Sequence, residues 1–273
     1  MKEDLYARLS RRYLALDIHK HYSIVAGVDF DGDVVLEPRR IEHGELEAWA
    51  LKHIEPSDYV VIESTTNAWH IYDLLEPLAE KVLVANPIKV KQIAQARVKT
   101  DIRDTLILAR LLAANLIPSI WVPPAHVREL RYLLSQRRHL IGMHTATVNR
   151  MHSVAHRHHL SHPRGKRFKE KNIGWQQSEE LSGSEQFQLE LDMNTKQHLH
   201  AQTELITEKL RVMSHEAPWS KDMMYLMQLP GFGIITGMTV LAAIGDISRF
   251  PSFKKLSGYS GLVPGVEQSG TKK

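Results

Sequence analysis

The chain has 273 residues, of which 43% are hydrophobic and 24% are charged, with a formal net charge of +4. This length and apolar content predict one large domain or two ordinary ones with a substantial core. Cysteine is absent, which excludes disulfides and thiolate metal sites, and no apolar run is long enough to span a membrane. We therefore expect a cytoplasmic protein without a membrane partner.

The first 122 residues follow an order of strands and helices that is typical of an α/β domain. Apolar runs predict five strands, at residues 13–18, 22–30, 34–37, 59–63 and 81–85. Amphipathic spacing predicts helices at residues 44–53, 68–78, 88–96 and 101–115. A hairpin turn at Asp31-Gly32-Asp33 makes the first three strands an antiparallel meander. The expected sheet is therefore mixed.

Prolines at positions 118, 123 and 124 separate this domain from a second half with a different pattern. Two long helices, expected at residues 127–159 and 187–216, are joined by a polar segment. This pattern predicts an antiparallel helical hairpin or coiled coil over residues 123–217. The hairpin either packs only on itself or mediates self-association. Residues 218–273 then form a small, mostly α domain with helices expected at 234–244 and 250–259.

The helical hairpin carries a strongly basic segment. Residues 125–175 contain eleven Lys or Arg and eight His against two acids, Glu129 and Glu170. Such a segment is either a solvated face or a surface for the phosphates of DNA or RNA. The candidate contacts are Arg150, Arg157, Arg164, Lys166, Arg167 and Lys169. A zinc site is a weaker alternative, because no Cys or carboxylate completes the set His152, His156, His158, His159 and His162.

A short glycine motif, Gly231-Phe232-Gly233, precedes the apolar helix expected at residues 234–244. Backbone N–H groups at a helix N-terminus suit a phosphate, so Gly231 and Gly233 are candidate nucleic-acid contacts. A plain turn between two helices explains the same residues. The motif by itself leaves both interpretations open.

Four carboxylates stand at positions where they can meet. Asp17 interrupts the first apolar strand, and Glu63 ends the fourth. Asp101 and Asp104 share one face of a helix, although this pair alone also fits an ordinary helix start with Thr100 as N-cap. Burying an ionised carboxylate is costly unless a cation accompanies it. If the two strands are neighbours, the four acids predict a site for two Mg²⁺ ions of the kind that promotes phosphodiester displacement.

The chain carries a series of short motifs in a fixed order: Leu14-Ala15-Leu16-Asp17 with His19-Lys20, Val61-Ile62-Glu63-Ser64-Thr65, Lys99-Thr100-Asp101-Ile102-Arg103-Asp104, Leu229-Pro230-Gly231-Phe232-Gly233, Ile244-Gly245-Asp246-Ile247-Ser248-Arg249-Phe250, Tyr259-Ser260-Gly261-Leu262-Val263-Pro264 and Gln268-Ser269-Gly270. In sequence and spacing, these motifs resemble those of the DEDD transposases of the IS110/IS1111 group, which are related to the Piv DNA invertases. The similarity covers nearly the whole chain.

The resemblance implies a RuvC-like, RNase H-type fold for residues 1–122, a coiled-coil arm over 123–217 and a C-terminal transposase domain over 218–273. It implies that Asp17, Glu63, Asp101 and Asp104 are a metal-binding tetrad. It also implies a bacterial, nucleoid-associated recombinase of an insertion sequence. Its expected partners are DNA, a structured non-coding guide RNA and further copies of itself, as a dimer or as a tetramer on DNA.

The serine nucleophile of the family, which is thought to form a phosphoserine link to DNA, maps to Ser269, with Ser260 as the alternative. Lys272 near this serine and Lys20 near Asp17 are candidate phosphate contacts. Family members usually continue further, so a truncated chain is one expectation. Two other functions stay open: a RuvC-type structure-specific nuclease that needs Mg²⁺ but no serine, and a catalytically silent protein that binds nucleic acid.

Overall fold

The computed structural model describes residues 11–93, 100–160 and 180–263 of the chain. The chain divides into two compact units, Met1–Val122 and Pro123–Lys273. The first unit combines strands and helices, and the described part of the second is helical. No helix within the described ranges is long and apolar enough to cross a lipid bilayer.

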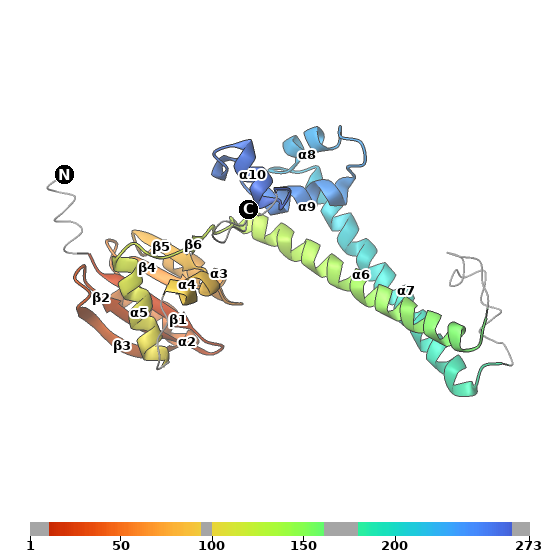
Figure 1. Cartoon of the computed structure of the whole chain (residues 1–273), viewed down its shortest axis with the longest axis horizontal. Coiled ribbons are helices and arrows are strands. Elements are labelled where there is room, and N and C mark those ends of the chain that lie inside the picture. The colour runs from red at the N-terminus through yellow and green to blue at the C-terminus, as the bar shows by residue number, and fades with distance from the viewer. Residues whose placement is uncertain (1–10, 94–99, 161–179, 264–273) are drawn as a thin grey trace, which may run out of the picture. The chain divides into compact units, whose positions relative to one another are not determined.

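The first unit is built on a six-stranded mixed sheet in the order β3-β2-β1-β4-β5-β6 (Figure 1). β1 lies in the interior, antiparallel to β2 and parallel to β4, and β5 continues the parallel direction. β3 and β6 form the two edges, each antiparallel to its neighbour. The strands are β1 (Tyr13–Ile18), β2 (Tyr22–Val28), β3 (Val34–Glu42), β4 (Tyr59–Glu63), β5 (Lys81–Ala85) and β6 (Ser119–Ile120).

Helices cover both faces of this sheet. α2 (His43–His53) and α3 (Ala68–Leu75) pack into the apolar core on one face. α4 (Pro87–Ile93) and α5 (Asp101–Ala113) pack into the core on the other face. The sheet is therefore the middle layer of an α/β sandwich, and its central strands are apolar on both sides.

β1 shows how its residues are shared between the two faces. Leu14 and Leu16 pack with α2 and α3, whereas Tyr13 and Ala15 pack with α5. Side chains alternate along a strand, so Asp17 continues the series that faces α5. The alternation therefore delivers a carboxylate to the α5 side of the sheet.

β3 is longer than the sequence pattern predicts. The expected strand ends at Glu37 because Pro38 follows, but the observed strand continues to Glu42. Proline lacks an N–H donor and is tolerated on edge strands, where one side makes no ladder bonds. β3 is such an edge, and its register with β2 shifts near this position. The pattern also misses β6, which is only two residues long and follows Pro118.

The described part of the second unit consists of helices. α6 and α7 lie along each other, and α9 packs on α6, α7 and α8 (Figure 1). We call the α6–α7 pair the arm. The elements are α6 (Ala125–Arg157), α7 (Gly183–Ser214), α8 (Ser220–Leu226), α9 (Ile234–Ile244), the 3₁₀ turn η2 (Ile247–Arg249) and α10 (Phe253–Tyr259).

The two helices of the arm run antiparallel. Arg137 Nε donates to Thr207 Oγ1 near one end, and Arg157 pairs with Glu185 near the other. α7 begins at Gly183, four residues earlier than predicted, because Ser182 and Glu185 form a capping box that bonds to backbone N–H groups in both directions. The two helices thus pack antiparallel along each other, and the coiled-coil hairpin predicted for this segment stays a prediction.

Two arginine side chains donate hydrogen bonds to carbonyl groups at the C-terminus of α9. Arg131 of α6 donates to the Ala242 carbonyl at 2.8 Å, and Arg249 of η2 donates to the Ile244 carbonyl at 2.9 Å. Cationic side chains are favourable at a helix C-terminus because the last carbonyl groups have no partner within the helix. The Arg131 bond joins α9 to the arm, and the Arg249 bond joins η2 to α9. The separate domain predicted for residues 218–273 stays a prediction.

Candidate metal centre

Asp17 and Glu63 occupy equivalent positions on neighbouring strands. β1 and β4 are parallel, with Leu16 opposite Ile62, so the next residue on each strand is a carboxylate. Paired strands lie roughly 4.8 Å apart. Glu63 also follows the alternation of β4 onto the α5 side, since Val61 packs there. The two acids therefore lie side by side at the C-terminal ends of β1 and β4, on the same face of the sheet.

α5 carries the second pair of acids. Thr100 is its N-cap, and the Thr100 Oγ1 accepts a hydrogen bond from the Arg103 N–H at 3.3 Å. Asp101 and Asp104 lie in the first turn, where the helix dipole favours negative charge. The helix start predicted from the sequence is confirmed. The same first turn also brings Asp101 close to Asp17 and His19.

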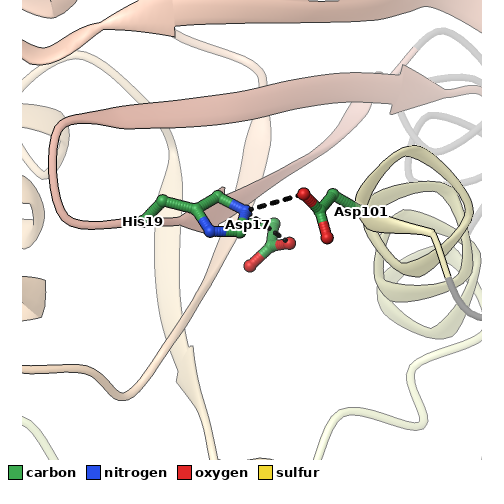
Figure 2. A group of neighbouring side chains, drawn as sticks. All are labelled: Asp17, His19 and Asp101. Carbon is green, nitrogen blue, oxygen red and sulfur yellow. Dashed lines mark ion pairs between the residues drawn. The ribbon is translucent and has the colours of Figure 1, made fainter.

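A histidine lies between two of the acids, as Figure 2 shows. His19 Nε2 is 3.3 Å from Asp17 Oδ2 and 3.3 Å from Asp101 Oδ2. One possible ligand atom from each of the three residues lies within 4.8 Å of the others. The Nε2 atom is buried, and both of its contacts are at ion-pair distance. Three donor atoms therefore surround one small volume.

Negative charge is crowded at this point. Burial raises the pKa of Asp17 above its ordinary value of 3.8, His19 opposes the shift, and the Asp101 and Asp104 carboxylates add to it. A group whose ionised form is disfavoured by burial and by like charges gains from a bound cation. Two carboxylates and an imidazole nitrogen, with donor atoms within 4.8 Å of one another, are a donor set that fits a divalent metal ion.

The structure brings the predicted tetrad together in part. Asp17 and Asp101 belong to the close group, whereas Glu63 and Asp104 have no ligand atom within it. Both of these acids are nevertheless nearby, because Glu63 follows the residue paired with Leu16 and Asp104 acts on the pKa of Asp17. The role of all four residues as metal ligands stays a prediction.

Sequence reasoning does not single out His19 as a site residue, although it lies in the first of the motifs. Its position two residues after Asp17 was an available signal, because side chains two apart along an extended chain share a face. The approach of Asp101 from α5 is not visible in that local pattern. Only the tertiary contact makes His19 part of the group.

Three of the charged residues predicted to contact nucleic acid lie within the part of the chain that the structure describes. Lys20 is exposed in the turn between β1 and β2, next to His19. Arg150 and Arg157 form ion pairs inside the arm, with Asp192 and Glu185 respectively. Their contact with nucleic acid stays a prediction. The same holds for the predicted contacts outside the described residues, which are Arg164, Lys166, Arg167, Lys169 and Lys272.

The glycine motif lies at the start of α9. Gly231 has a φ of +83°, a conformation that favours glycine, and Gly233 is the N-cap residue of α9. Apart from the glycine itself and its neighbours in the chain, no atom among the described residues lies within 4 Å of where a side chain would begin at either position. The N-terminus of α9 therefore has room for a ligand, and a phosphate contact there stays a prediction.

Of the two candidate nucleophiles, Ser260 lies within the described residues and Ser269 does not. Ser260 follows α10, and its Oγ donates to the Ser257 carbonyl at 2.8 Å. The choice between them therefore stays a prediction.

The arm histidines gain no support as a zinc site. His158 Nε2 pairs with Glu185 Oε1 at 2.9 Å, which gives this imidazole a structural partner. Within the described ranges, the group of possible metal ligands is that of Asp17, His19 and Asp101. His162 lies outside those ranges.

Two family models match the chain. A transposase model of the DEDD IS110 type matches residues 14–160, which is more than half of the chain and includes the four acids. A transposase model of the IS116/IS110/IS902 family matches residues 223–273.

Individual relatives agree with these matches. The transposase for insertion sequence element IS1111A of Coxiella burnetii is 25% identical over 264 residues, covering 96% of this chain and 71% of that protein. The pilin gene-inverting protein of Moraxella bovis is 29% identical over 240 residues, covering 83% and 63%. The putative transposase y4qE of Sinorhizobium fredii is 24% identical over 212 residues, covering 78% and 51%. This chain thus spans about half to seven tenths of the length of these relatives, and it belongs to the IS110 family of transposases.

Proposed function

We propose that the chain is a DNA transposase or recombinase whose first unit is a RuvC-like, RNase H-type catalytic domain. The observation that carries the proposal is the approach of Asp17 and Asp101 at the edge of the sheet, with Glu63 and Asp104 nearby. Family membership supports it, as does similarity to a transposase and to a pilin gene-inverting protein. DNA is the substrate in this proposal.

The four acids hold divalent cations, with Mg²⁺ as the physiological candidate because carboxylate oxygens are its preferred ligands. When bound, such ions supply Lewis-acid stabilisation to the oxygens of a phosphodiester. β1 and β4 are central strands, so Asp17 and Glu63 are held rigidly, while α5 positions Asp101 and Asp104 over the same edge. Lys20, exposed beside the site, orients a DNA phosphate.

The proposed nucleophile is Ser269. A serine hydroxyl is a weak nucleophile at neutral pH and needs an adjacent base. In the attack, Ser269 Oγ forms a bond to phosphorus and its hydroxyl proton passes to a carboxylate of the tetrad. The bond from phosphorus to a deoxyribose oxygen breaks, and that oxygen leaves as a hydroxyl after taking a proton from water. The tetrad and Ser269 belong to different units of the chain, so we propose that a second subunit delivers the serine.

A second copy of the chain is also proposed as a partner of the arm. Besides the seam that faces α6, α7 has an interrupted stripe of apolar side chains that are 49% to 68% exposed, with polar residues such as Asn194 and His198 in its middle. We call it the outer stripe; it consists of Phe187, Leu191, Leu205 and Val212. Leu205 and Val212 are seven residues apart and Leu191 is fourteen before Leu205, which is the heptad spacing of coiled-coil contacts. A guide RNA, held by basic residues of the arm, completes the proposed assembly.

The test is DNA cleavage with the chain, Mg²⁺ and the DNA and RNA sequences that flank its reading frame. We expect Asp101→Asn to abolish strand cleavage, because the variant keeps the helix cap but loses an anionic ligand. The control is Glu47→Gln, which neutralises an exposed acid on α2 and leaves the site intact. Cleavage by Asp101→Asn at the rate of the control would remove the tetrad from the mechanism.

Ser269→Ala separates recombination from nuclease activity. In a recombinase, this variant binds DNA but forms no covalent protein–DNA adduct and no exchanged strands. Full cleavage by Ser269→Ala, without an adduct in either protein, would identify a RuvC-type nuclease instead. Binding without any Mg²⁺-dependent cleavage by the unaltered chain would identify a catalytically silent nucleic-acid-binding protein.

A further inference from the structure

The candidate metal centre contains a group that the tetrad does not include. His19 Nε2 lies 3.3 Å from a carboxylate oxygen of both Asp17 and Asp101 (Figure 2). Around an ion such as Mg²⁺, with ligands about 2.1 Å away, adjacent octahedral ligand atoms are roughly 3 Å apart and opposite ones roughly 4.2 Å apart. The spacing of the three donor atoms, all within 4.8 Å, is close to that of ligands around one ion.

The imidazole ring of His19 packs against Tyr22, which Arg40 supports in turn. His19 stacks on Tyr22 with ring centroids 4.5 Å apart, and the backbone N–H of His19 donates to the Tyr22 carbonyl at 2.9 Å. The Arg40 guanidinium lies over the Tyr22 ring at 3.7 Å, and Glu42 holds Arg40 in turn. The ring stack and the backbone bond restrict the positions that the imidazole can take beside the two carboxylates.

Two roles fit a histidine between two acids. As an imidazolium, it is a counter-ion that donates an N–H to a carboxylate and competes with a metal for the site. As a neutral imidazole, it offers the Nε2 lone pair as a ligand. The buried Nε2 atom lies 3.3 Å from a carboxylate oxygen of both Asp17 and Asp101, so a cation placed between the two carboxylates would meet the imidazole nitrogen as well.

We propose that His19 Nε2 is a direct ligand of the divalent cation, so that the centre has mixed nitrogen and oxygen donors. This inference rests on the proposed function, because it assumes that the acids bind a metal. Imidazole binds Mn²⁺ and Co²⁺ better relative to Mg²⁺ than carboxylate or water does. The centre therefore prefers these transition-metal ions over Mg²⁺ more strongly than four carboxylates alone do.

The experiment measures metal binding to the full chain without DNA. The probes are Mn²⁺, followed by electron paramagnetic resonance, and Mg²⁺, followed through its competition with Mn²⁺. We expect His19→Asn to weaken Mn²⁺ binding by about 10–100-fold and Mg²⁺ binding less, and to remove the histidine nitrogen coupling from the pulsed spectrum. The control is His21→Asn, two residues further along the same turn, whose side chain is exposed.

The opposite result identifies the opposite role. If His19 is a counter-ion, its replacement removes a competing positive charge, so Mn²⁺ binds His19→Asn more tightly and the unaltered chain shows no nitrogen coupling. Either observation overturns the proposal. Circular dichroism checks the fold of the variant, and His19→Gln repeats the measurement with a side chain of different length.

Asp101→Asn separates this proposal from the one on which it rests. Loss of Mn²⁺ and Mg²⁺ binding in Asp101→Asn, with binding unchanged in His19→Asn, leaves the acidic centre in place and removes only the histidine. If the unaltered chain binds neither ion more tightly than Asp101→Asn does, both proposals fail.

Discussion

Glu185 is the residue at which several contacts of the arm meet. It forms the capping box with Ser182 at the start of α7, and its carboxylate receives His158 Nε2 at 2.9 Å and Arg157 at 3.2 Å. These donors, with His158 contributing most, lower the pKa of Glu185 from 4.5 to about 2. One carboxylate therefore ties the end of α6 to the beginning of α7.

The lowered pKa of Glu185 predicts how the stability of the arm depends on acid. A carboxyl whose pKa is lower in the folded chain takes up its proton more readily when unfolded, so protonation favours unfolding. The contribution is complete above pH 4.5 and is lost as the pH falls toward about 2. We expect Glu185→Gln to flatten the acid-unfolding curve in this window, as measured by circular dichroism. An identical curve for Glu185→Gln and the unaltered chain would contradict the assignment; Glu190→Gln, exposed on α7, is the control.

Asp17 presents the reverse case, because its neighbours disfavour its charge. Burial and the Asp101 and Asp104 carboxylates act against the ionised form. Without divalent ions, we expect Asp17→Asn to raise the melting temperature, because the amide removes a charge that burial and the neighbouring carboxylates disfavour. With Mn²⁺ or Mg²⁺, the unaltered chain gains stability and the variant does not, because a ligand stabilises only the state that binds it. Equal gains in both proteins would argue against Asp17 as a ligand.

At the scale of the elements, the arm carries a charge within its apolar seam. Asp192 of α7 is only 3% exposed, and Arg150 of α6 donates to both of its carboxylate oxygens. A buried carboxylate is costly without a partner, so this pair fixes the register of the two helices more than it adds stability. The Arg150 guanidinium, which the sequence analysis predicts to contact nucleic acid, is therefore bound to Asp192 in the folded arm.

A double substitution tests how much the pair contributes to stability. Arg150→Leu leaves the Asp192 carboxylate buried without its partner, and we expect a loss of about 1–3 kcal/mol in the free energy of unfolding. Adding Asp192→Leu replaces the pair by apolar side chains and recovers most of that loss. Urea denaturation measures both values. A double variant that is no more stable than Arg150→Leu would show that the pair is not the source of the loss.

At the scale of the whole molecule, the outer stripe of α7 predicts self-association. Leu205, within this stripe, is 68% exposed and adds little to the core of the arm. We expect Leu205→Glu to shift sedimentation toward the monomer without lowering the melting temperature, because a buried charge is costly only in the assembly. Gln197→Glu adds the same charge to α7 away from the stripe and should leave association unchanged. If both variants associate like the unaltered chain, the partner surface lies elsewhere.

Local sequence patterns by themselves determined much of the first unit. The apolar strands Tyr13–Ile18 and Tyr59–Glu63 were predicted with their observed bounds, because side-chain alternation and burial on both faces leave a continuous apolar run. The Thr100 cap was also predictable, since an N-cap depends on residues within one turn. The positions of Asp17 and Asp101 as candidate ligands came from the same local signals.

Only the tertiary structure decided which of these groups meet. His19 and Asp17 are close in sequence, but Asp101 lies more than eighty residues further along the chain. The three residues form one group because α5 packs on the face of the sheet that carries Asp17. Pro38 does not end its strand because that strand lies at the sheet edge, which is a consequence of strand order. Local rules act through neighbours in sequence, whereas strand order and helix packing bring distant residues together. The individual acids could therefore be read from the sequence, and their arrangement around one point could not.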